Sequence, residues 1–171
     1  MAIQYLFRVG VQVTLVILSV VLLSCGESKN LLKSPAQNRR VSGYATDSFR
    51  YEVYQLPSGK ETLALSLRIV NVAGTQSPLR MLSGNIEQYS TYYEYLLNRA
   101  AADFRLVCDK EELAPAAYSV ENNYNAFPFE TINISFYTGR KARSRKRKVL
   151  LFADNVFSHQ VIWMKMINDF K

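Results

Sequence analysis

Residues 49–70 read FRYEVYQLPSGKETLALSLRIV, and this stretch decides the fold. Apolar and polar side chains alternate over 49–54, and a second alternating run follows over 62–70. Alternation with a period of two is typical of a strand that buries one face. Pro57 and Gly59 lie between the two runs and favour a tight turn. The stretch therefore predicts a β-hairpin.

Shorter runs farther along the chain are also typical of strands. They cover residues 104–109, 118–121, 131–138 and 149–153. In the third run, Ile132, Ile134 and Phe136 are predicted to point inward. Residues 74–78 are predicted to be a loop and 110–112 a charged turn.

The segment after Asn155 is open to two interpretations. Phe157, Val161 and Met164 would share one face of a helix. The same segment holds Val, Ile and Trp at positions 161–163, and these residue types favour a strand. We prefer a closing strand.

Residues 85–102 change to helical spacing, with apolar side chains three and four positions apart. Ser83 or Asn85 can cap the start of this helix, and Glu87 suits its first turn. Its tyrosines are interpreted as core side chains with exposed hydroxyls, and a sugar-stacking surface is the alternative. They are Tyr89, Tyr92, Tyr93 and Tyr95. The whole pattern predicts a mainly β fold, an immunoglobulin-like β-sandwich with one inserted α-helix.

An uncharged apolar run, Val9–Leu23, lies near the start of the chain and follows Arg8. A membrane-spanning helix needs about 20 apolar residues, so this shorter run fits the core of an export signal better. The run ends at Ser24 and Cys25. There are two alternatives to a cleaved export signal in which this cysteine has a role. One is an uncleaved membrane-spanning helix, and the other is a signal peptide whose cysteine is incidental.

Residues 22–25, LLSC, resemble the lipobox of bacterial lipoproteins. The resemblance implies that residues 1–24 are a signal peptide and that Cys25 receives diacylglycerol. Two or three acyl chains anchor a protein stably, whereas one holds it only marginally. The expected location is therefore the bacterial cell envelope, membrane-anchored by lipid on the periplasmic or surface side.

Residues 25–48 are polar, contain Pro35 and show no apolar period, so they predict a flexible tether. Residues 49–171 are then the folded β-sandwich domain, of a size typical for one domain. Two segments of this domain, 122–128 (NNYNAFP) and 152–157 (FADNVF), are similar to small lipoproteins of Bacteroidota with one β domain. The similarity implies the same fold and envelope location.

The formal net charge is +7, and it is concentrated in one predicted loop. The loop contains Arg140, Lys141, Arg143, Arg145, Lys146, Arg147 and Lys148. Near an anionic membrane each such residue contributes about 1 kcal/mol, so the loop is a candidate for binding an anionic membrane or envelope polymer. A solvated hairpin tip is the alternative. Nucleic acid is not expected, because the chain shows no signature of a nucleic-acid-binding fold.

Candidate catalytic residues do not form a recognisable motif. Cys108 lies in a strand-like run and is interpreted as a core residue, and His159 is the only histidine, so no metal site is predicted. The carboxylates are scattered over turns and strand ends, at Glu111, Glu112, Glu121, Glu130 and Asp154. We therefore expect no cofactor and predict a lipid-anchored envelope binding or assembly module. The alternative is an envelope hydrolase or carbohydrate-active enzyme that uses clustered carboxylates.

Overall fold

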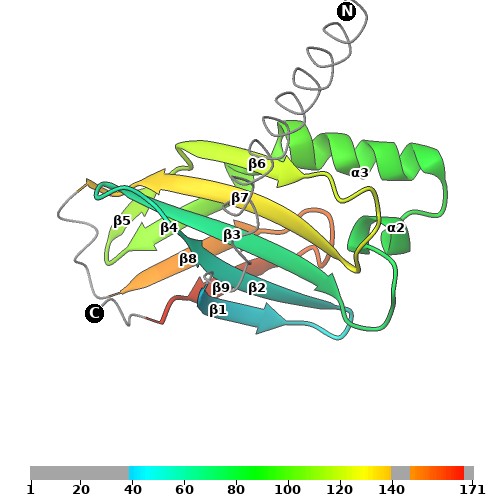
Figure 1. The fold of residues 1–171 in the computed structure, drawn as a ribbon, viewed down its shortest axis with the longest axis horizontal. Coiled ribbons are helices and arrows are strands. Elements are labelled where there is room, and N and C mark those ends of the chain that lie inside the picture. The colour runs from blue at the N-terminus through cyan, green and yellow to red at the C-terminus, as the bar shows by residue number, and fades with distance from the viewer. Residues whose placement is uncertain (1–38, 140–146, 168–171) are drawn as a thin grey trace, which may run out of the picture. The chain divides into compact units, whose positions relative to one another are not determined.

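A computed structural model describes residues 39–139 and 147–167, and these form a β-sandwich (Figure 1). One antiparallel sheet has five strands in the order β1-β2-β3-β7-β6. Its strands are β1 (Arg39–Ala45), β2 (Phe49–Leu56), β3 (Thr62–Asn71), β7 (Phe129–Tyr137) and β6 (Ala117–Glu121). The second antiparallel sheet has four strands in the order β5-β4-β8-β9. Its strands are β5 (Glu111–Leu113), β4 (Phe104–Cys108), β8 (Lys148–Ala153) and β9 (Val161–Lys165).

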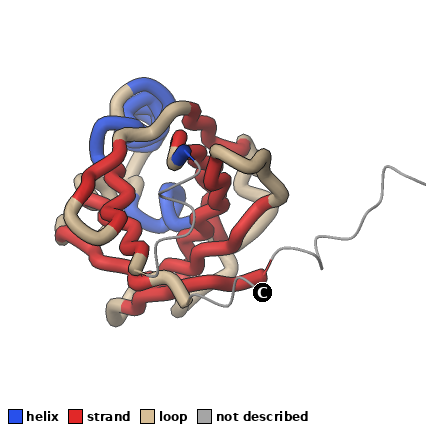
Figure 2. Tube along the Cα trace, turned by 90° about the vertical axis from the view of Figure 1, so that its left-hand side faces the viewer, coloured by secondary structure: helices blue, strands red, loops and turns tan. Residues whose placement is uncertain are grey.

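The core lies between the two sheets, which face each other in the side view (Figure 2). Each strand alternates, so that every second side chain points into this core. The phenyl rings of Phe104 and Phe152 stack at its centre, with 4.3 Å between their centroids. Burial of such rings and of the surrounding aliphatic side chains supplies most of the driving force for folding. The mainly β sandwich predicted from the sequence is confirmed, and its immunoglobulin-like identity stays a prediction.

The predicted hairpin is confirmed by the pairing of β2 with β3, which runs from Phe49 opposite Asn71 to Leu56 opposite Ala64. The predicted inward side chains of β7, Ile132, Ile134 and Phe136, are all buried. The closing strand is confirmed as β9, which pairs with β8. Cys108 is a buried core residue at the end of β4, as interpreted from the sequence.

The predicted helix is α3 (Ile86–Asn98), and a 3₁₀ turn, η3 (Ala100–Asp103), follows it. The Asn85 side chain caps its start by accepting a hydrogen bond from the amide of Gln88 at 2.9 Å. One end of the helix lies beside β6 (Figure 1), and there the Tyr118 hydroxyl donates to the Leu96 carbonyl at 2.8 Å. The four tyrosines of the helix are partly buried against the core. No helix among the described residues is long and apolar enough to cross a membrane.

Three elements differ from the sequence predictions. β1 lies inside the predicted tether, so the folded part begins by Arg39 rather than Phe49. A short helix, α2 (Pro78–Leu82), follows the predicted loop, and β5 replaces part of the predicted charged turn. In each case tertiary pairing or a capping residue orders a segment whose own apolar pattern is too short to be recognised.

β1 joins the two sheets along one edge of the sandwich. It pairs with β2 within the five-stranded sheet, with a register shift between Arg40 and Ser42. Beside β9, the amide of Ile167 donates to the Val41 carbonyl at 2.8 Å. The Ser42 hydroxyl donates to the Lys165 carbonyl, also at 2.8 Å. The edge between the two sheets is therefore closed by β1.

Candidate functional site

The predicted basic loop lies mostly outside the described residues, as do Cys25 and the predicted signal peptide. Arg140, Lys141, Arg143, Arg145 and Lys146 belong to this undescribed part. Arg147 is exposed just before β8. Lys148 is the first residue of β8 and is only 1% exposed, so it does not belong to an exposed basic loop as predicted.

The candidate catalytic residues lie apart in the fold. Cys108 pairs with Lys148 at the start of β8, whereas His159 is exposed beyond the other end of that strand. Glu121 accepts a hydrogen bond from Asn133 on the outer face of the five-stranded sheet, and Asp154 accepts one from Tyr51 inside the core. These carboxylates therefore belong to separate networks. Within residues 39–139 and 147–167, no three His, Cys, Asp or Glu side chains gather in a group that could hold a metal ion.

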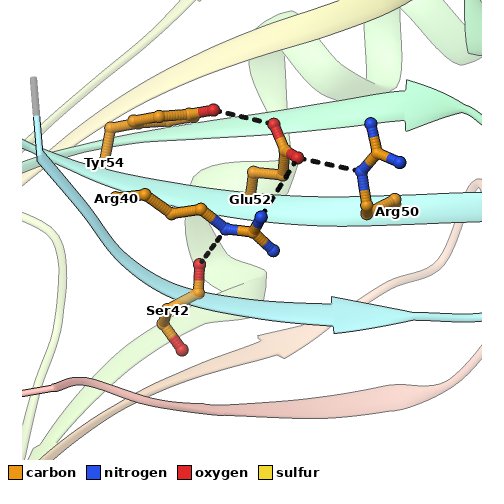
Figure 3. Close-up of polar contacts among 5 residues, drawn as sticks. All are labelled: Arg40, Ser42, Arg50, Glu52 and Tyr54. Carbon is orange, nitrogen blue, oxygen red and sulfur yellow. Dashed lines mark hydrogen bonds and ion pairs between the residues drawn. The ribbon is translucent and has the colours of Figure 1, made fainter.

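The structure instead concentrates charged side chains around Glu52 on β2 (Figure 3). Arg50 Nε donates to Glu52 Oε1 at 2.8 Å, and the Tyr54 hydroxyl donates to Glu52 Oε2 at 2.8 Å. From β1, Arg40 Nη1 lies 3.5 Å from Glu52 Oε1. We call these four residues, Arg40, Arg50, Glu52 and Tyr54, the Glu52 network.

The local shape of β1 lets Arg40 reach this carboxylate. The register shift after Arg40 places Gly43 opposite Glu52. The Arg40 guanidinium folds back over Gly43, where a Cβ atom would collide with it and lie 3.1 Å from the Tyr51 carbonyl oxygen. A bulge commonly redirects a side chain in this way, and a glycine allows the close approach.

Burial alone would raise the pKa of Glu52, but its partners outweigh this effect. Hydrogen bonds from Tyr54 and Arg50, and the positive charges of Arg40 and Arg50, hold the pKa below its usual range. Glu52 is therefore ionised in the folded protein at neutral pH. The Arg40 and Arg50 side chains are about half exposed, at 51% and 46%, so both can also meet a molecule in solvent.

A groove of about 470 Å³ lies between β1 and β9, next to the Glu52 network. It is lined by Arg40, Ser42, Gly43, Trp163, Lys165 and Ile167. Trp163 is 59% exposed and Ile167 is 62% exposed, so the groove offers apolar surface beside its two cations. We call this feature the β1–β9 groove.

The sequence pattern identified the strand of Trp163 but not the face on which this side chain lies. In β9 the buried residues are Ile162 and Met164, while Val161, Trp163 and Lys165 are exposed. The groove also needs β1, which lies within the predicted tether. Comparison with family models, curated proteins and solved structures finds no match to this chain.

Proposed function

We propose that this protein is a lipid-anchored binding module of the bacterial cell envelope, and that its β1–β9 groove holds an anionic polymer. The observation that carries the proposal is the exposed Trp163 in a groove that also contains Arg40 and Lys165. An exposed aromatic ring provides contact area at little cost in side-chain entropy, and two cations favour an anionic partner.

The groove is also suited to an extended ligand. It lies on the seam between the two sheets and continues into the Glu52 network, so that Arg40 belongs to both features. Arg50 extends the positive charge along the same side of β2. A long anionic molecule could therefore contact several cations at once, which strengthens binding more than one isolated charge would.

The leader sequence supports the envelope location. The residues 22–25 resemble a lipobox, and acylation of Cys25 would keep the domain at a membrane surface where envelope polymers are concentrated. Arg140, Lys141, Arg143, Arg145, Lys146 and Arg147 would add an anionic-surface contact.

The anchor is tested by metabolic labelling with a radioactive fatty acid. We expect the wild-type protein to incorporate the label and the Cys25→Ala variant to remain unlabelled and unprocessed. Equal labelling of both proteins would contradict the anchor at Cys25, and an absence of label in both would contradict a lipid anchor altogether.

The groove is tested by a photo-crosslinking amino acid placed at position 163 in cells. We expect an adduct with envelope polysaccharide that is absent when the same amino acid replaces Met81, a 37% exposed residue on α2. Identical products from both positions, or no adduct at position 163, would contradict a binding role for the groove.

A further inference from the structure

Arg68 on β3 is held between two aromatic rings on the outer face of the five-stranded sheet. The centre of its guanidinium lies 4.3 Å from the ring centroid of Phe129 on β7 and 5.2 Å from that of Tyr54 on β2. Both distances are within the range of cation–π attraction. The two rings therefore fix the position of a permanently charged group.

The guanidinium makes no hydrogen bond or ion pair with other described residues. Its Nε atom is buried and has no acceptor among them. Glu52 is the residue directly opposite on β2, but the carboxylate of Glu52 is held by Arg40, Arg50 and Tyr54. A guanidinium has five N–H donors, and only the Nε donor of Arg68 is among the buried atoms without a partner. The donors on the two Nη atoms are therefore the ones that a ligand can reach.

The outer face of the five-stranded sheet also carries a shallow depression, which is lined by apolar as well as polar side chains and does not include Arg68 itself. The depression has a volume of about 350 Å³ and lies over β3, β7 and β6. It is lined by Leu56, Ala64, Ala117, Tyr118, Ser119, Asn133, Ile134 and Ser135. Asn133 on β7 lies opposite Ser119 on β6. Arg68 lies opposite Thr131 on β7, which is two residues before Asn133 and on the same face of the sheet. Hydroxyl and amide groups beside a flat, shallow surface suit the hydroxyls of a sugar chain.

We propose that Arg68 is an anion-recognition residue, and that its guanidinium binds the carboxylate of an acidic polysaccharide lying over this depression. The inference rests on the proposed function, since it extends the anionic polymer from the β1–β9 groove onto the outer face of the sheet. A planar guanidinium binds a carboxylate with two parallel hydrogen bonds, which fixes orientation as well as affinity. Because Tyr54 and Phe129 already restrict the Arg68 side chain, little side-chain entropy remains to be lost on binding.

The carboxylates on the same face do not compete for Arg68. Glu52 is engaged in its own network, and Glu121 accepts a hydrogen bond from Asn133 at 2.7 Å. Their negative charges discriminate against a ligand with densely packed charges, because such a ligand would meet these carboxylates as well. A polysaccharide with one carboxylate for each sugar ring, separated by neutral hydroxyls, fits this pattern better than polyglutamate.

The test measures the affinity of the full-length protein, in detergent, for a fluorescent galacturonic-acid oligosaccharide and for its neutral methyl ester. We expect the wild type to bind the acid and not the ester. Arg68→Gln should weaken binding about tenfold or more, and Arg68→Lys should also weaken it, because lysine keeps the charge but loses the two-pronged geometry. The matched control is Arg105→Gln, which removes the same charge from β4 of the other sheet. There, Arg105 donates to the Ala102 and Phe104 carbonyls.

Thermal unfolding of each variant shows whether it is folded, and only folded variants are compared. Unchanged affinity in Arg68→Gln would overturn the Arg68 site, and so would a failure of the wild type to bind the acid. If Trp163→Ala abolishes binding while Arg68→Gln does not, the proposed function stands without the inference. Tighter Arg68-dependent binding to polyglutamate, or to vesicles of anionic lipid, would overturn the assignment to a polysaccharide.

Discussion

Asp154 is the residue that ties the loop after β8 to the opposite sheet. It is 1% exposed, and its Oδ2 atom accepts a hydrogen bond from the Tyr51 hydroxyl at 2.5 Å. The amides of Val156, Phe157 and Ser158, and the Ser158 hydroxyl, also donate to this carboxylate. Burial, together with the neighbouring Asp154, raises the pKa of Tyr51 well above its usual range. The tyrosine therefore remains a hydrogen-bond donor at any physiological pH.

We predict that Asp154→Ala lowers the free energy of unfolding by about 3–5 kcal/mol, because it leaves several buried donors without an acceptor. Tyr51→Phe should cost only about 1–2 kcal/mol, because Asp154 keeps its other donors. Denaturant unfolding of both variants measures the difference. Equal losses would contradict a central role for Asp154 in organising the loop.

The lowered pKa of Glu52 predicts that the free energy of unfolding decreases as the pH is lowered. Because the pKa of Glu52 is lowered in the folded protein, ionised Glu52 stabilises the fold at pH values above the ordinary pKa of a glutamate. This contribution is lost as the pH falls through the lowered pKa. We therefore expect Glu52→Gln to be less stable than wild type at neutral pH, by about 1 kcal/mol given the partial exposure of its arginine partners. The difference should vanish in acid, and a constant difference at every pH would contradict this account.

Among the elements, α2 lies against a buried carboxylate of β7. Glu130 on β7 is 2% exposed, and its Oε1 atom has no hydrogen-bond partner among the described residues. Burial raises the pKa of Glu130, while hydrogen bonds from Ser77 and the Leu79 amide, at the start of α2, lower it in part. The net effect is a raised pKa, so the charged form of Glu130 is disfavoured in the folded protein.

The sign of the pH dependence is therefore opposite to that of Glu52. When folding raises the pKa of a carboxyl group, the free energy of unfolding falls as the pH rises from the ordinary pKa of that group to its raised pKa. We expect Glu130→Gln to be more stable than wild type at neutral pH, with the difference shrinking in acid. Glu112→Gln, at an exposed position on β5, is the control and should show no such trend. Lower stability of Glu130→Gln at neutral pH would contradict the prediction.

Elements with a long, regular apolar pattern were predictable from the sequence. The β2–β3 hairpin, β7 and α3 each carry enough alternating or helically spaced residues to identify them. β1 was missed because its pairing shifts register after Arg40, so that Val41 is its only buried large apolar side chain. The helix α2 has only five residues, although its capping Ser77 followed by Pro78 was a readable start signal.

The candidate site was predictable only in part. Basic character and an aromatic residue near the end of the chain were visible in the sequence, but the grouping of Arg40, Lys165 and Trp163 depends on β1 lying beside β9. The arrangement around Arg68 depends on the register of three strands, since Tyr54 and Phe129 come from different neighbours of β3. Single-strand patterns carry no information about such cross-strand neighbours.

At the scale of the whole molecule, β1 determines where the folded domain starts. It pairs with β2, which would otherwise be the edge strand of the five-stranded sheet. It also buries Val41 and contributes the Val41 carbonyl and the Ser42 hydroxyl to the seam with β9. An uncovered β2 would present a row of unpaired backbone groups, which promotes association between molecules. The same strand supplies Arg40 to the β1–β9 groove, so the stability of the fold and the lining of the proposed binding groove depend on one element.

We therefore predict that a chain beginning at Arg39 folds, whereas one beginning at Phe49 is strongly destabilised. The shorter chain loses the burial of Val41 and the hydrogen bonds of the seam, a loss on the order of 3–5 kcal/mol. Denaturant unfolding gives the stabilities, and size-exclusion chromatography shows whether the shorter chain associates. Val41→Ala in the longer chain is the control, because it removes part of the packing while keeping the strand. Equal unfolding midpoints for the two chains would show that β1 contributes nothing to the fold, and the groove would then need another support.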